Sequence, residues 1–376
     1  HINCLSKIVK LLNAIHILLW TNIIRKDVHL EVTMLIGHAL QVNNGDCFML
    51  VFPNCSKPKL LVIDSGYVGN FQKFKNTLFR LIETYDCDVY MLLTHIDRDH
   101  IGGFKCLFRN FNPKICKRVA GFYYNTLESI QRFAPCVTKK MVQAADEISV
   151  TTKTGYADAV TLEKFLTEKK IFVQTGLQAG CQIDFCDGLR AHVLSPSARS
   201  LAKYQHWCRR ESTRKTTAAA ADYHKPLAAL MTKNFVADDS PVNASSISLL
   251  IEAFGYRFLF LGDALPGDVA AGLKALGYSK DQAVQVDLVK VSHHGSRYST
   301  SPELLQLIQG KRFLISGTGG TGHPDKETIA RIIRFQEQPV FCFNYDIAEK
   351  ILTAAEVKEY HIRTEFGTEW RLERDI

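Results

Sequence analysis

The chain has 376 residues, of which 46% are hydrophobic and 22% charged, and its formal net charge is +8 at pH 7. This composition excludes an intrinsically disordered chain, and the length predicts one or two globular domains. The 11 cysteines include no Cys-x-x-Cys pair, which excludes a zinc finger held by such pairs and favours a cytoplasmic protein with reduced thiols. The positive charge suits a polyanionic substrate.

Residues 1–33 differ from the sequence that follows. The apolar run from Ile8 to Ile24 is interrupted by Lys10, Asn13 and His16, so it is a poor membrane span, and no stable membrane insertion is expected. We predict an N-terminal extension over 1–33 and a single domain over 34–376.

From Leu35 the pattern is typical of β-strands. Asn44-Gly45 separates two apolar runs and predicts a hairpin. Leu60 to Ile63 is a short buried strand that ends at Asp64. Residues 71–85 then repeat apolar side chains at helical spacing, which predicts a helix with one face in the core.

The densest cluster of chemically active residues lies in VYMLLTHIDRDHIGGF, residues 89–104. A predicted buried strand, Val89 to Leu93, leads into six residues of which four can bind a metal. Gly102 and Gly103 are expected to turn the backbone into a helix that begins near Phe104. The alternative is a charged turn in which Asp and His are only capping residues, but the density of ligand types disfavours it. The four are His95, Asp97, Asp99 and His100.

The central segment, about 120–225, is expected to be a variable, partly helical insertion. Within it, residues 203–215 carry Lys and Arg around Tyr204 and Trp207. Basic residues between aromatic ones are typical of a single-stranded nucleic-acid groove. A solvated loop is the alternative interpretation.

Three further apolar runs each lead into polar residues in the second half of the chain. Phe258 to Leu261 precedes Gly262-Asp263, and the next run precedes His293-His294. The last run leads into a glycine-rich turn, 317–322, followed by His323. Since ligands bind at the carboxyl ends of strands in α/β sheets, these residues are candidates for one site.

Together these motifs resemble a known family. T-H-x-D-x-D-H-x-G-G resembles the H-x-H-x-D-H motif of metallo-β-lactamase-fold hydrolases, with Asp97 in place of the second His. Combined with I-D-S-G at 63–66, N-x-S-S at 243–246, G-D at 262–263 and K-V-S-H-H-G-S at 290–296, it resembles the soluble hydrolase domain of ComEC-type DNA-uptake proteins. Without a channel region, the chain resembles a stand-alone relative. The resemblance covers roughly residues 34–345 and implies an α/β fold, a four-layer αββα sandwich.

The resemblance also implies a site with two divalent metal ions. One metal would be held by His95 and Asp97, the other by Asp99, His100 and His294, and Asp263 would bridge them. Asp64 would support the metal loop from behind through a ligand histidine. Asn243 stands where most members of the family place a ligand His, so it is at best a weak, neutral oxygen ligand.

These residue types predict the chemistry. Carboxylates in place of imidazoles make the site oxygen-rich, which favours Mn²⁺ at least as much as Zn²⁺ and allows Mg²⁺. Two such metals activate water for in-line attack on a phosphoryl group, with Asp99 or Asp263 orienting the water. His323 and His293 are candidates for contacting phosphate or protonating the leaving oxygen.

We therefore predict a metallo-hydrolase acting on ester bonds, in the first place a phosphodiesterase or nuclease with nucleic acid as its partner. One alternative is hydrolysis of a small phosphodiester or ester by the same metals. The other is a degenerate metal-site module in a larger complex, for example one for defence, which only Asn243 favours.

Overall fold

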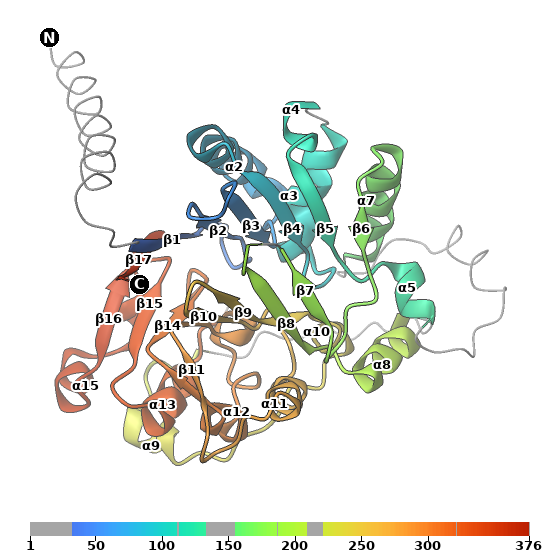
Figure 1. Ribbon diagram of the computed structural model, residues 1–376. Coiled ribbons are helices and arrows are strands. Elements are labelled where there is room, and N and C mark those ends of the chain that lie inside the picture. Colours follow the sequence, from blue (N-terminus) through green and yellow to red (C-terminus); the bar gives the residue numbers. More distant parts are fainter. Residues whose placement is uncertain are drawn as a thin grey trace, which may run out of the picture.

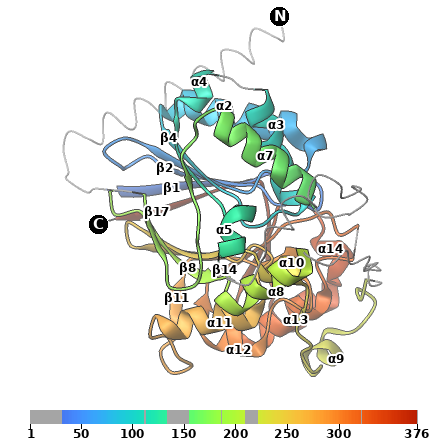
Figure 2. The same cartoon turned by 90° about the vertical axis from the view of Figure 1, so that its right-hand side faces the viewer.

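The structure is a computed structural model that describes residues 32–110, 113–132, 155–185, 187–208, 221–320 and 322–375. Two β-sheets lie face to face, one with the strand order β17-β1-β2-β3-β4-β5-β6 and one with β16-β15-β14-β12-β10-β9-β8-β7. Helices α2, α3 and α7 cover the outer face of the first sheet, and α11, α12 and α13 that of the second (Figures 1 and 2). The predicted four-layer αββα sandwich is therefore confirmed.

The first sheet contains β1 (Val32–Ala39), β2 (Phe48–Phe52), β3 (Lys59–Ile63), β4 (Asp88–Leu92), β5 (Val119–Tyr123), β6 (Val173–Gln174) and β17 (Glu369–Asp375). Its antiparallel part runs from β17 to β3, and β3 to β6 are parallel. The helices on this side are η2 (Val68–Asn70), α2 (Phe71–Tyr85), α3 (Arg98–Arg109), α4 (Pro113–Cys116), α5 (Leu127–Arg132) and α7 (Tyr156–Glu168).

The second sheet contains β7 (Gln182–Asp184), β8 (Arg190–Ser195), β9 (Ser248–Ala253), β10 (Tyr256–Phe260), β12 (Leu288–Lys290), β14 (Arg312–Ile315), β15 (Val340–Phe343) and β16 (Arg363–Phe366). A separate parallel pair is formed by β11 (Val284–Val286) and β13 (Ile308–Gly310). The remaining helices are α8 (Ala198–Cys208), α9 (Leu227–Met231), α10 (Pro241–Ala244), α11 (Pro266–Ala275), η3 (Ser292–Gly295), α12 (Pro302–Gln306), α13 (Lys326–Phe335), α14 (Ala348–Ile351) and α15 (Ala354–Glu359).

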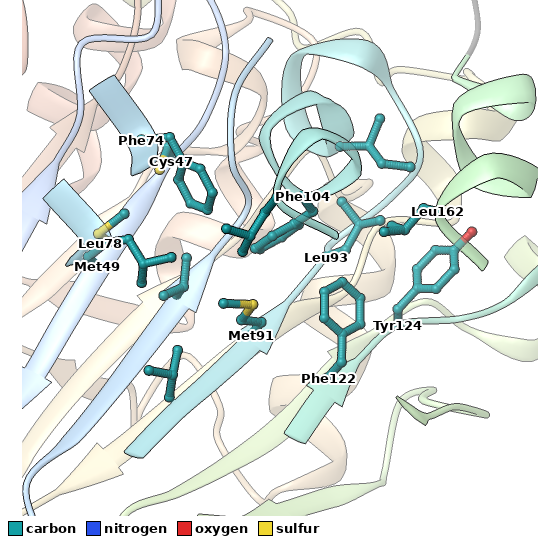
Figure 3. Packing of buried hydrophobic residues seen from close by; sticks show 14 of the residues in the cluster. Cys47, Met49, Phe74, Leu78, Met91, Leu93, Phe104, Phe122, Tyr124 and Leu162 are labelled. Carbon is teal, nitrogen blue, oxygen red and sulfur yellow. The ribbon is translucent and has the colours of Figure 1, made fainter. Parts of the chain in front are cut away.

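Buried apolar side chains fill the space between neighbouring layers. Under the helices of the first sheet, Phe104 of α3 meets Phe74 and Phe122 edge to face, with ring centroids 5.7 and 5.1 Å apart (Figure 3). All five residues of β3 are buried, because helices cover one face and the second sheet covers the other. Helix α2 spans 71–85 as predicted and buries the expected face.

Helix α3 corrects the predicted role of two glycines. It begins at Arg98, not near Phe104, so Gly102 and Gly103 lie inside the helix. A Cβ on Gly102 would lie 2.3 Å from the backbone nitrogen of Val68, and one on Gly103 would lie 2.4 Å from the carbonyl oxygen of Ser65. The glycines therefore let α3 approach the loop that follows β3. As a result, Asp99 and His100 project from the first turn of the helix.

The predicted central insertion is also revised. Strands β5 and β6 belong to the first sheet, and β7 and β8 to the second. Much of the segment from 120 to 225 is thus part of the two sheets, while its residues 133–154 and 209–220 lie outside the described ranges. Periodicity missed this, since β6 and β7 have two and three residues.

The start of the domain lies two residues earlier than predicted. Strand β1 begins at Val32 and pairs with the last strand, β17. Most of the predicted extension, residues 1–31, lies outside the described part of the chain. Among the described helices, none has the length and apolar character needed to cross a membrane.

The arrangement of the strands brings the candidate residues to one edge. Strands β3 and β4 are parallel, and so are β10, β12 and β14. Their carboxyl ends lead into the segments that carry Asp64, His95, Asp263, His294 and Ser316. The site is therefore assembled from both sheets, in agreement with the general position of ligand sites in such folds.

Candidate metal centre

Asp263 lies at the centre of the candidate site. Its Oδ2 is 3.8 Å from His95 Nε2, 3.7 Å from His100 Nε2 and 3.8 Å from His293 Nε2. Burial alone would raise the pKa of Asp263, but His293 and His100 hold this pKa well below its usual range. An ionised carboxylate thus faces three imidazoles, two from the segment that joins β4 to α3 and the first turn of α3, and one from η3.

Two groups of ligand atoms share this centre. In the first, His95 Nε2 is 3.8 Å from Asp97 Oδ2. In the second, Asp99 Oδ2 is 3.8 Å from His100 Nε2 and 3.5 Å from His294 Nε2. An ion that binds nitrogen and oxygen at about 2.0–2.2 Å separates its ligand atoms by about 3–4 Å. Both groups therefore have the spacing of a coordination shell.

Several buried polar atoms at this centre lack a hydrogen-bond partner among the described residues. They are His95 Nε2, His100 Nε2, His294 Nε2 and Asp263 Oδ1. Buried polar atoms are rarely left unpaired, because each one costs free energy. Since all four are electron-pair donors that converge on the same space, they fit divalent metal ions.

Asp64 positions two of these imidazoles from behind. Its Oδ2 is 2.8 Å from His100 Nδ1, and its Oδ1 accepts a 2.8 Å hydrogen bond from the backbone nitrogen of Thr94. The Thr94 hydroxyl donates to Asp64 and lies 3.0 Å from His95 Nδ1. Asp64 thus contacts His100 directly and reaches His95 through Thr94, which is the role of an outer partner of metal ligands.

Sequence analysis missed Asp46, which stands directly behind His294. Asp46, His100, Asp263 and His294 each offer a ligand-type atom within 4.8 Å of the others. Asp46 Oδ1 is 3.4 Å from His294 Nδ1 and accepts a 2.6 Å hydrogen bond from Ser316 Oγ. The signal in the sequence was a single Asp after the Asn44-Gly45 turn, two residues before the apolar strand β2 begins.

Asn243, the weak candidate ligand, lies behind His293. Its amide nitrogen is 2.6 Å from Asp238 Oδ2 and 3.2 Å from His293 Nδ1. These contacts make Asn243 a partner of an imidazole, and Asp238 a second residue that sequence analysis missed.

His293 and His323 form the open side of the site. Their side chains are each 27% exposed, whereas those of His95 and His100 are fully buried. The two ring centroids are 5.2 Å apart. His323 Nδ1 is 3.1 Å from Asp325 Oδ2, and Arg297 Nε donates a 2.8 Å hydrogen bond to the other oxygen of Asp325. These two imidazoles are therefore more accessible to solvent than those of His95 and His100.

The predicted basic stretch is only partly described. Residues 209–215 lie outside the described ranges, and residues 203–208 belong to α8. Tyr204 is 1% exposed and stacks on Trp207 with ring centroids 5.8 Å apart. A buried Tyr204 is not a surface on which a base stacks, so this part of the groove hypothesis is wrong.

Metal binding is expected to strengthen as the pH rises. Burial alone would lower the pKa of His294, but Asp46 and Asp99 raise it to about 9. Protonated His294 therefore stabilises the metal-free fold below about pH 6.5, and this contribution is lost between about pH 6.5 and 9. Because a metal must displace that proton, affinity for Mn²⁺ should rise up to about tenfold per pH unit over this interval.

Chelator-buffered Mn²⁺ titrations from pH 6.5 to 9 measure this effect. The variant His294→Gln, which has no proton to displace at this position, should show a smaller slope. An affinity of the unaltered chain that is constant between pH 6.5 and 8 would contradict the raised pKa.

Comparisons with known proteins yield similarity to solved structures only. No protein-family profile matches the chain, and neither does any curated protein. Zn²⁺-bound PqqB from Methylobacterium extorquens is 12% identical, with a TM-score of 0.39 over 88% of this chain and 87% of that one. The MIM-2 metallo-β-lactamase is 12% identical (TM-score 0.31, 70% and 83% covered), and the flavodiiron protein from Giardia intestinalis 10% (0.30, 91% and 93%). The fold assignment rests on the chain's own two sheets and outer helices, because identities of 10–12% and TM-scores below 0.4 do not establish it. These similarities identify neither a reaction nor a substrate.

Proposed function

We propose that the chain is a metal-dependent hydrolase that cleaves phosphodiester bonds at a centre of two divalent metal ions, with nucleic acid as the first substrate class. The observation that carries this proposal is that the unpaired Nε2 atoms of His95 and His100 lie within 3.8 Å of Asp263 Oδ2. His294, whose Nε2 is also unpaired, offers a ligand atom within 4.8 Å of those of Asp263 and His100. When bound, two such metals lower the pKa of water and polarise a phosphoryl oxygen. The motif resemblance to ComEC-type hydrolase domains supports the same reaction.

The residues around Asp263 divide into two ligand sets. His95 and Asp97 would hold one metal, Asp99, His100 and His294 the other, and Asp263 would touch both. Three carboxylates among these ligands favour Mn²⁺, with Zn²⁺ and Mg²⁺ as alternatives.

The open side supplies groups for the substrate. Asp325 accepts a hydrogen bond from His323 Nδ1–H and a second one from Arg297 Nε, and these contacts fix the orientation of the ring. A protonated His323 can therefore give its Nε2 proton to the leaving oxygen, while Asp99 or Asp263 accepts a hydrogen bond from the attacking water.

A small phosphodiester or ester is the second candidate substrate. The burial of Tyr204, which removes one stacking surface for a base, favours it. A degenerate module in a larger complex is the third candidate, and the replacement of a ligand His by Asn243 favours that one. A cytoplasmic location stays a prediction.

Metal content and cleavage measured together test this proposal. The chain is loaded with Mn²⁺, Zn²⁺ or Mg²⁺ and offered a fluorescent single-stranded DNA and bis(p-nitrophenyl) phosphate, with Asp99→Ala and His294→Ala alongside. The proposal expects Mn²⁺-dependent cleavage of both substrates that both variants lose. Cleavage of the small diester alone supports the second candidate, and absence of bound metal under every loading overturns the enzyme.

His323→Gln separates proton transfer from metal binding. We expect unchanged metal content and a turnover of DNA lower by about 10²–10⁴-fold, because a general acid contributes about that much. The loss should shrink with bis(p-nitrophenyl) phosphate, whose leaving group needs no proton. Equal losses on both substrates would contradict this role.

A further inference from the structure

We propose that Asn243 is a positioning residue that keeps the imidazole proton of His293 on Nε2, so that His293 donates a hydrogen bond to an anionic oxygen of the substrate and is not a metal ligand. The role toward a substrate rests on the proposed function. The position of the proton rests on the hydrogen bonds alone. A neutral imidazole has one N–H donor and one acceptor nitrogen, and the partner of the first nitrogen decides the state of the second.

His100 and His95 have acceptors at Nδ1. His100 Nδ1 faces a carboxylate oxygen of Asp64, which only accepts, so this nitrogen carries the proton. Thr94 gives its hydroxyl hydrogen to Asp64 and is left as an acceptor for His95 Nδ1. Both rings therefore present a lone pair on Nε2 to the centre, as a metal ligand must.

His294 has the same arrangement through different residues. Ser316 gives its hydroxyl hydrogen to Asp46, so its oxygen accepts from His294 Nδ1, which lies 3.1 Å away. The lone pair of His294 is again on Nε2. The hydrogen-bond partners of Nδ1 thus hold all three imidazoles in the same tautomer.

His293 is prepared in the opposite way. The Asn243 amide group lies 2.6 Å from Asp238 Oδ2, and because a carboxylate only accepts, the amide nitrogen must face it. The same nitrogen is 3.2 Å from His293 Nδ1, so its second hydrogen points to this ring. His293 Nδ1 accepts that hydrogen, and the proton of the neutral ring must be on Nε2.

Two further contacts support this assignment. The direct separation of His293 Nδ1 from Asp238 Oδ2 is 3.8 Å, which is too long for a hydrogen bond that would reverse the tautomer. Asp238 itself is held in place, because its Oδ1 accepts a 2.9 Å hydrogen bond from the backbone nitrogen of Ser240. The orientation of the amide is therefore built into the segment that carries Asn243.

The consequence concerns substrate recognition. His293 presents an N–H group at the open side, 3.8 Å from Asp263 Oδ2. A donor beside a metal centre suits an anionic oxygen of a phosphoryl or carboxyl group. His323 is the internal contrast: its Nδ1 faces a carboxylate, so its neutral form carries the lone pair on Nε2.

Nitrogen-15 NMR of the histidine side chains tests the tautomer directly. In the metal-free chain, the neutral form of His293 should show the proton on Nε2, and that of His323 the proton on Nδ1. Asn243→Asp replaces the donor by an acceptor and should move the His293 proton to Nδ1. Ser240→Ala is the matched control, because Ser240 Oγ contacts the backbone nitrogen of Asn243 and not the side-chain amide group.

Binding and turnover provide the second readout. In Asn243→Asp, the freed lone pair of His293 should tighten Mn²⁺ binding by about tenfold or more. Turnover should fall by about 10²-fold, the usual effect of losing one donor to a developing oxyanion. Ser240→Ala should change neither quantity by as much.

Either of two results overturns the assignment: a wild-type His293 with its proton on Nδ1, or a tautomer that is unchanged in Asn243→Asp. A wild-type chain that shows the expected tautomer but hydrolyses no ester would overturn the proposed function and the donor role, and leave the tautomer assignment standing. A chain that hydrolyses DNA with the proton on Nδ1 would overturn this inference alone.

Discussion

Asp263→Ala is expected to remove metal binding and to lower the rate of ester cleavage by at least about 1,000-fold. Asp263 is the residue whose carboxylate lies within 3.8 Å of the Nε2 atoms of His95, His100 and His293. Metal ions supply several kcal/mol of transition-state stabilisation, and each 1.4 kcal/mol is a factor of ten. Metal analysis and turnover of bis(p-nitrophenyl) phosphate measure both effects.

The fold should survive this substitution. Asp263 Oδ1 has no hydrogen-bond partner in the described chain. The backbone nitrogen of Asp263 donates to Ser246 Oγ, and the substitution leaves this hydrogen bond in place. Asp281 is exposed, and Asp281→Ala is therefore the control for the loss of one carboxylate outside the site. A folded Asp263→Ala chain that keeps its full metal content would show that Asp263 is not a ligand.

Lys290→Met is expected to destabilise the metal-free chain by about 3–5 kcal/mol. Lys290 of β12 and Asp46 of the β1–β2 turn form an ion pair in which both side chains are 1% exposed, and Lys290 Nζ also donates to the carbonyl oxygen of Gly262. Removing one partner of a buried pair leaves the other charge uncompensated. Urea unfolding at pH 7 measures the loss.

The pH dependence of the destabilisation in Lys290→Met identifies its cause. Burial alone would raise the pKa of Asp46, but Lys290 and His294 keep it far below its usual range, so Asp46 stabilises the wild-type fold above about pH 4 and this contribution is lost as the pH falls. Without Lys290 the pKa of Asp46 should rise, and the variant should recover relative stability as the pH falls from 6 to 4. The double variant with Asp46→Asn should also recover part of the loss. A destabilisation that changes neither with pH nor with the Asp46→Asn substitution would indicate lost packing against Phe48.

Local sequence was sufficient for elements that are long or chemically dense. Residues 71–85 repeat apolar side chains at the period of a helix, and the structure has α2 over the same residues. The motif from His95 to His100 is compact enough that one loop and one helical turn hold all four candidate ligands. The glycines of α3 were misread, because a close approach between segments leaves no signature that differs from a turn.

The sequence by itself indicated the four-layer sandwich through the resemblance of its motifs to those of metallo-β-lactamase-fold hydrolases, and it determined the residue types of a metal centre at the strand ends. Tertiary structure decided which nitrogen of each imidazole faces that centre. Asp46 reaches His294, and Asp238 reaches His293 through Asn243, across 248 and 55 positions (294 − 46 and 293 − 238). The physical reason is that a hydrogen bond depends on the position and direction of two groups in space, and only the packing of the two sheets sets these for residues so far apart in the chain.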